Sequence, residues 1–149
     1  MRVSYKIRNI ERVTKKLREL EGGVLSSNVE VVQEATLMVY NAAVKSLQEN
    51  TDGEKVTRYN PRREAFASKP GDAPNTDTGR AVKSIKFEFI NKGQTGVVGT
   101  NLVYLAAFEL SSKPSIRRPW LSIAFYRNEK QIRKLFRESL KAITKKVAK

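Results

Sequence analysis

The last quarter of the chain follows a helical period over a longer distance than any other segment. Pro119 suits a first turn, and apolar residues then recur with helical spacing at Leu121, Phe125, Ile132, Leu135, Phe136, Ile143 and Val147. Unbroken from Pro119 to Lys146, such a helix is about 42 Å long at about 1.5 Å per residue. It is the largest element that the sequence predicts.

Positive charge is concentrated on this predicted helix. The chain of 149 residues has 29 Lys or Arg and 15 Asp or Glu, which gives a formal net charge of +14. Residues 113–149 carry twelve basic and two acidic side chains, a net of +10. The basic residues take up the polar face that the apolar stripe leaves: Arg127, Lys130, Arg133, Lys134, Arg137, Lys141, Lys145 and Lys146.

Charge this uneven predicts an acidic partner, with Arg133 and Arg137 as interface candidates. The partner is either nucleic acid or an acidic protein surface, and the alternative is a solvated face that only keeps the protein soluble. Aromatic residues are sparse on this helix, so base stacking is not indicated.

Two helices are predicted at the N-terminus. Ile10, Val13, Leu17 and Leu20 form the stripe of a short amphipathic helix that ends at Gly22-Gly23. Residues 26–28 (Ser-Ser-Asn) then offer N-cap side chains for a longer helix that continues to about Asn50.

Residues 51–77 are predicted to be a long loop, because periodicity is lost and turn-forming Gly, Pro, Asn and Asp residues replace it. A stretch this long without secondary structure is uncommon in a compact domain, so it is either a partner-binding arm or a disordered segment. Aromatic and arginine side chains typically anchor interfaces, so Tyr59, Phe66 and the pair Arg62-Arg63 predict an arm that contacts a partner.

A β-hairpin is predicted at about 84–101, followed by a short helix over 102–110. Ile85, Phe87 and Phe89 alternate with Lys86 and Glu88, which is the period of a half-buried strand. Residues 91–96 read as the turn, and residues 97–100 as the returning strand. The expected fold is α+β: one domain, residues 1–149, in which a small antiparallel sheet packs against two N-terminal helices and a long C-terminal helix.

The composition argues against an enzyme. The chain has no Cys and no His, which excludes thiol nucleophiles, imidazole catalysis and the usual zinc, copper and haem ligands. Asp72, Asp77 and Glu109 could form a carboxylate-metal nuclease site, and an apolar setting could raise the pKa of Glu109. The favoured interpretation is that both aspartates serve turns and caps and that Glu109 pairs with an arginine such as Arg80. We therefore expect no catalytic residue, no cofactor and no metal.

No segment is predicted to enter a membrane. The sequence at Met1–Lys6 has no apolar run behind it, as a signal peptide requires, and the apolar stretch Tyr104–Phe108 is far shorter than the roughly 20 residues of a spanning helix. We expect a soluble protein that stays in the cell that makes it.

Arg117-Arg118-Pro119-Trp120 has two interpretations. A rigid proline beside two guanidinium groups and the single Trp would make an interface anchor. Equally, Trp120 could belong to the core while the arginines lie in a solvated loop.

The order of these pieces resembles a family of phage tail components. The residues are Asp77-Thr78-Gly79-Arg80, Ser84-Ile85, Val98-Gly99, Tyr104 to Glu109, and Arg118-Pro119-Trp120-Leu121 with Ala124. The family comprises the neck or tail-completion proteins of long-tailed bacteriophages, which act in head-tail joining. The chain departs from its pattern at Ser111, where glycine is usual, and at Ile123, where a second proline is common.

The resemblance implies a structural role in the virion. It implies a ring of identical subunits, six as the expected number, that closes the head-proximal end of the tail tube and docks on the connector or stopper protein below the capsid. The partners would be other copies of the chain, the connector and the tail tube protein, with genomic DNA passing nearby. The protein would occupy the neck or tail of the virion and, during assembly, the host cytoplasm. Arg80 joins the interface candidates through its place in the motif.

Overall fold

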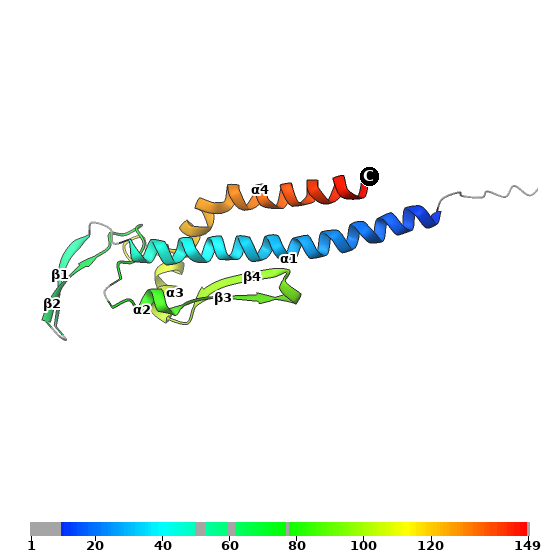
Figure 1. Cartoon of the computed structure of the whole chain (residues 1–149). Helices are drawn as coiled ribbons and strands as arrows, with labels where there is room; N and C mark the ends of the chain where they lie inside the picture. Colours follow the sequence, from blue (N-terminus) through cyan, green and yellow to red (C-terminus); the bar gives the residue numbers. More distant parts are fainter. Residues whose placement is uncertain (1–9, 50–52, 60–61, 77, 149) are drawn as a thin grey trace, which may run out of the picture.

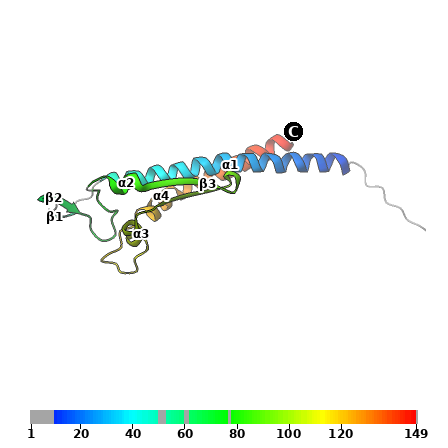
Figure 2. The same ribbon diagram turned by 90° about the horizontal axis from the view of Figure 1, so that it is seen from below.

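The computed structural model describes residues 10–49, 53–59, 62–76 and 78–148. Its longest element is α1 (Ile10–Gln48), which runs along most of the elongated molecule. Helix α4 (Leu121–Ala148) packs antiparallel along one side of α1, and a β-hairpin lies along another side (Figure 1). Figure 2, a view from the hairpin side, shows β3 following the same stretch of α1. The α+β class and the long C-terminal helix are confirmed.

The prediction of two N-terminal helices is wrong, because α1 continues through Gly22 and Gly23. Gly23 faces α4, where an added Cβ would lie 3.2 Å from Cγ2 of Ile143. A glycine there lets the two helices approach closely without ending either of them. The expected N-cap residues are interior to the helix: the Ser26 hydroxyl donates to the Gly22 carbonyl at 3.0 Å, and the Ser27 hydroxyl pairs with that of Ser139 on α4.

The predicted hairpin is confirmed as β3 (Ile85–Ile90) and β4 (Thr95–Thr100), joined by the 3-10 turn η1 (Asn91–Gly93). The strands are antiparallel, with Phe87 opposite Val98 and Phe89 opposite Gly96. Side chains alternate across a strand, so these residues share the face that packs on α1. The Phe87 ring lies 5.0 Å from that of Tyr40, edge to face, and anchors the hairpin to α1.

The prediction of a loop over 51–77 is wrong for its first half, because residues 54–59 and 62–67 are two paired strands of a second hairpin. Strands β1 (Glu54–Tyr59) and β2 (Arg62–Ala67) pair antiparallel with Glu54 opposite Ala67. This hairpin, which we call the arm, lies beyond the end of α1 (Figure 1). No side chain of β1 is fully buried, so the alternation that reveals a half-buried strand is missing from its sequence.

A small core lies where the C-terminal half of α1 meets the start of α4. Trp120, Leu47 and Leu105 are its largest fully buried side chains. The indole Nε1 of Trp120 donates to the Leu105 carbonyl at 3.2 Å, which ties the start of α4 to α3 (Val103–Leu110). Helix α3 confirms the short helix predicted over 102–110, whereas α2 (Arg80–Ser84) was not predicted.

Candidate functional site

The described residues expose more large apolar side chains than they bury. Seventeen large hydrophobic residues are exposed, whereas only six are buried: Val31, Val39, Leu47, Ile85, Leu105 and Trp120. The exposed ones occur along α1, on the arm, on β3 and β4, on α3, at Ile116 in the loop after it, and on α4. Single exposed hydrophobic residues are normal, but repeated groups of them mark surfaces that bind a partner.

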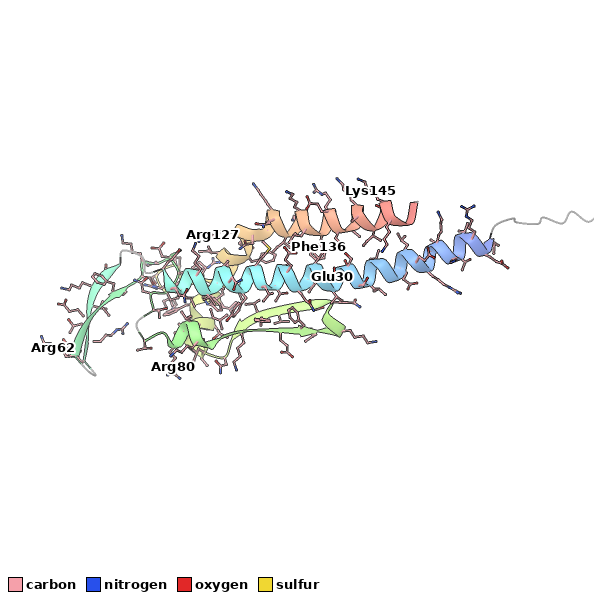
Figure 3. The ribbon with its side chains drawn as sticks, in the orientation of Figure 1. Glu30, Arg62, Arg80, Arg127, Phe136 and Lys145 are labelled. Atoms are coloured by element: carbon pink, nitrogen blue, oxygen red, sulfur yellow. The ribbon has the colours of Figure 1, made fainter. Side chains whose placement is uncertain are left out.

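The arm exposes three of the predicted interface residues. Tyr59 is 81% exposed and Phe66 is 57% exposed. Arg62 is also exposed, and Figure 3 places it at the far end of the arm. Arg63 belongs to β2 and lies opposite Arg58, but its side chain lies outside the described part of the structure. A Lys55–Glu64 ion pair of 2.6 Å crosses the two strands. The arm thus offers aromatic and cationic groups to a partner.

Seven of the eight basic residues of α4 form the face that we call the basic face, on the outer side of the helix. The eighth, Lys146, lies beside Gly22 and Gly23 of α1 instead. Figure 3 shows Arg127 and Lys145 on the side of α4 away from α1, whereas Phe136 lies on the side toward it. Arg133 and Arg137 are exposed. Within the described residues, the basic face makes only two ion pairs, Arg133–Glu129 at 2.8 Å and Lys134–Glu138 at 3.7 Å. Five cations of this face, Arg127, Lys130, Arg137, Lys141 and Lys145, therefore make no ion pair within the described residues.

Trp120 is 1% exposed, so the structure places it in the core, as the second of the two interpretations has it. Arg118 is also used inside the chain. Its guanidinium donates to the Ser68 carbonyl at 2.9 Å and to the carbonyls of Ser115 and Ile116, and it lies 5.7 Å from the centre of the Phe108 ring. Arg117 is exposed. Of these three candidates, only Arg117 presents its side chain to a partner.

Glu109 caps α4, and the pairing with Arg80 is wrong. Its carboxylate accepts hydrogen bonds from the backbone N–H groups of Trp120 at 2.8 Å, Leu121 at 2.9 Å and Ser122 at 3.0 Å. These groups have no partner within the helix, and an anion there also interacts favourably with the helix dipole. Arg80 is exposed at the first residue of α2.

The pKa of Glu109 is lowered, which contradicts the raised value considered from the sequence. Burial raises the pKa, but the hydrogen bonds from the Ser122 hydroxyl and from the three backbone N–H groups outweigh it. The carboxylate is therefore held in its ionised form as a structural group.

The structure does not gather the carboxylates of the nuclease hypothesis. Asp72 lies in a turn, where its N–H donates to the Lys69 carbonyl at 3.1 Å, and Asp77 lies outside the described residues. Where the structure describes the chain, no group of three or more acidic side chains could hold a metal ion. Among the same residues, no helix is both long and apolar enough to cross a bilayer.

A groove that the sequence did not reveal lies between α1, β4 and α4. Its volume is about 570 Å³. Its lining is mostly apolar and comes from Val32 and Val39 of α1, Gly96 and Val98 of β4, and Phe125, Ile132 and Phe136 of α4. Each residue fits the period of its own element, so only their meeting in space makes the groove.

Comparison of this chain with protein-family models, curated proteins and solved structures gives no match.

Proposed function

We propose that this chain is a structural subunit of the neck of a long-tailed bacteriophage. It assembles into a ring with copies of itself, completes the tail and joins it to the head connector or stopper protein. Its partners are its own copies, the connector and the tail tube protein, and it catalyses no reaction. The ordered motifs that resemble the tail-completion family are the origin of this proposal.

One observation carries the proposal furthest: several motif residues, among them Ile85, Leu105, Trp120 and Ala124, meet in the core between α1, α3 and α4. Glu109 caps α4 through Trp120, and Trp120 fills the core against Leu105. The Ser84 hydroxyl meets that of Thr100 at 2.7 Å and joins α2 to the end of β4. A pattern of residues that builds a scaffold in this way supports a structural role.

The balance of exposed and buried apolar side chains also supports an assembled state. The described part of the chain exposes seventeen large hydrophobic residues, more than it buries in its own core. Contact with another protein would remove this apolar surface from water. Interfaces between copies of one chain bury such residues, and head-to-tail contacts between identical subunits close into a ring when the rotation permits it.

Electron microscopy of phage particles made without this protein tests the proposal. We expect unjoined heads and tails, or tails of uncontrolled length, and restoration of whole particles when the gene is supplied in trans. We also expect the protein in purified wild-type particles. Normal particles without the protein, together with its absence from wild-type virions, would overturn the proposal.

A second candidate function is a nucleic-acid-binding module, which the basic face favours. Eight cations and two acidic residues lie on α4, and contacts of Lys and Arg with phosphates make binding weaken steeply as salt rises. Titration of duplex DNA at two salt concentrations separates the two candidates. Binding at physiological salt by a protein that stays monomeric at high concentration would favour the module over the ring.

A further inference from the structure

Strand β4 has one edge without a partner strand. Where the structure describes the chain, the sheet has two strands, so β4 pairs with β3 alone. Its other edge offers backbone N–H and C=O groups that can pair with an added strand. The groove is lined by β4 and not by β3, so it lies on the side of this open edge.

The groove fits a strand whose side chains alternate. A strand added to the edge of β4 would point every second side chain toward α1 and α4, because side chains of a strand alternate between two faces. On that side lie Val32 of α1 and Phe125, Ile132 and Phe136 of α4. An occupant therefore needs apolar residues at alternate positions and polar residues between them.

The chain contains one segment with this pattern outside the described residues. Residues 2–8 read Arg-Val-Ser-Tyr-Lys-Ile-Arg, so Val3, Tyr5 and Ile7 alternate with Arg2, Ser4, Lys6 and Arg8. Strict alternation of this kind is typical of a strand with one buried face. We call residues 2–8 the N-terminal segment.

The N-terminal segment cannot reach the groove of its own chain. It is joined to Ile10, and Val32, where the groove begins on α1, lies 22 residues further along the same helix. At 1.5 Å per residue these positions are about 33 Å apart. A fully extended chain spans at most about 3.6 Å per residue, so Val3 extends no more than about 25 Å from Ile10. An N-terminal segment that fills the groove therefore belongs to another copy.

We propose that the N-terminal segment of one copy adds as a strand to the open edge of β4 of a neighbouring copy, with Val3, Tyr5 and Ile7 in the groove. The first turns of α1 continue this contact. The start of α1 extends past the end of α4 (Figure 1). Ile10, Val13 and Leu17 belong to the first turns of α1 and are exposed, so apolar residues follow the N-terminal segment directly. The contact joins two different surfaces and is head-to-tail, as a ring or a filament requires. It goes beyond the proposed function and requires only self-association.

Crosslinking of mixed variants tests this placement, because the chain has no cysteine of its own. Full-length Tyr5→Cys is mixed with full-length Phe125→Cys, and a bismaleimide crosslinker is added. We expect a covalent dimer in this mixture. The matched control replaces Phe125→Cys by Lys83→Cys, an exposed position on α2 away from the groove, and should crosslink at least several-fold less.

Two further outcomes would overturn the proposal. One is equal crosslinking of the groove and control positions. The other is a crosslink within a single molecule of the double variant at high dilution, because that would place the segment in its own groove.

A second variant avoids dependence on the introduced thiols. A variant with serine at Val3, Tyr5 and Ile7 should no longer self-associate in sedimentation experiments, in which no crosslinker is used. A variant with glutamine at Arg2 and Lys6 should still self-associate. Unchanged self-association of the triple variant would overturn the strand exchange. That result would leave the neck proposal standing, because the electron microscopy of particles tests that proposal separately.

Discussion

The carboxylate of Glu109 accepts the backbone N–H of Trp120 at 2.8 Å, so the end of α3 is bonded to the start of α4 across eleven residues. The same carboxylate accepts two more N–H groups of the first turn. These hydrogen bonds fix where α4 begins. They thereby also position the basic face of α4 and the residues of α4 that line the groove.

Replacement of Glu109 by Gln should destabilise the fold in a pH-dependent manner. Loss of a helix N-cap typically costs about 1–2 kcal/mol. The folded-state pKa of Glu109 is lowered from its ordinary value of 4.5, so the stabilisation is fully present above 4.5 and is lost as pH falls through the lower, folded pKa. Urea unfolding of wild type and Glu109→Gln from pH 7 to pH 2 should therefore show a gap that closes at low pH.

Glu88→Gln is the matched control for this series, since Glu88 is an exposed carboxylate on β3. It should stay within about 0.5 kcal/mol of wild type at neutral pH. A constant gap between wild type and Glu109→Gln over the whole pH range would show that the charge of the cap contributes nothing.

The sequence predicted the β3–β4 hairpin, which buries one face, but it did not predict the arm, which buries almost none of its side chains. The β3–β4 hairpin packs Phe87 on α1, and its period of two is visible in the sequence. The arm has the same architecture but buries almost nothing, so it carries no such period. The cap at the start of α4 could not be predicted either. The partners of Glu109 there are backbone N–H groups, which every residue except proline has, so no residue type in the sequence marks them.

The continuity of α1 and the groove depend on contacts between distant segments. Gly22-Gly23 has the composition of a helix end, and only the approach of Ile143 from α4 shows why a glycine suits the interior there. The groove joins three elements that are separated by dozens of residues. The basic face, by contrast, was predicted apart from Lys146, which lies toward α1, since one helical period defines the face.

Gly96→Ala should separate β4 from α1 and lower stability by about 1–3 kcal/mol, the usual cost of overpacking. A Cβ at Gly96 would lie 1.7 Å from Oγ1 of Thr36 and 2.8 Å from its Cβ. Gly99→Ala is the control in the same strand, because no atom lies within 4 Å of its added Cβ. Thermal unfolding of the two variants checks this, and equal melting temperatures would contradict the tight contact.

Gly22→Ala should stabilise the protein by about 0.5–1 kcal/mol, because glycine in a helix interior is less favourable than alanine by this amount. An added Cβ at Gly22 meets nothing within 4 Å. Gly23→Ala should be less favourable than Gly22→Ala, since its Cβ meets Ile143 at 3.2 Å. Denaturant unfolding measures both. Destabilisation by Gly22→Ala would mean that α1 is interrupted there, as the sequence first indicated.

Serine at both Tyr59 and Phe66 should weaken assembly while the free energy of unfolding changes by about 0.5 kcal/mol or less. Both side chains are exposed on an arm that the subunit itself does not need to bury. Serine at Lys83 and Lys86, two exposed polar positions on α2 and β3, is the control. Sedimentation velocity and incorporation into particles provide the measurements. Loss of cooperative unfolding in the arm variant would show that the arm is part of the core structure.

Charge reversal on the basic face, Arg133→Glu with Arg137→Glu, should weaken docking to the acidic partner without unfolding the domain. Both side chains are exposed. The local costs are the lost Arg133–Glu129 ion pair and two i,i+4 repulsions, between glutamate at 133 and Glu129 and between the glutamates at 133 and 137, each about 0.2–0.5 kcal/mol. Lys83→Glu with Lys86→Glu changes the net charge equally at exposed sites away from α4 and is the control.

Particle assembly and DNA titration at two salt concentrations are measured for both double variants. Impaired assembly of the α4 variant alone identifies an acidic protein as the partner, whereas loss of DNA binding with normal assembly identifies nucleic acid. If neither property changes, the basic face is a solvated surface, because a contact that uses these cations must respond to the reversal of two of them.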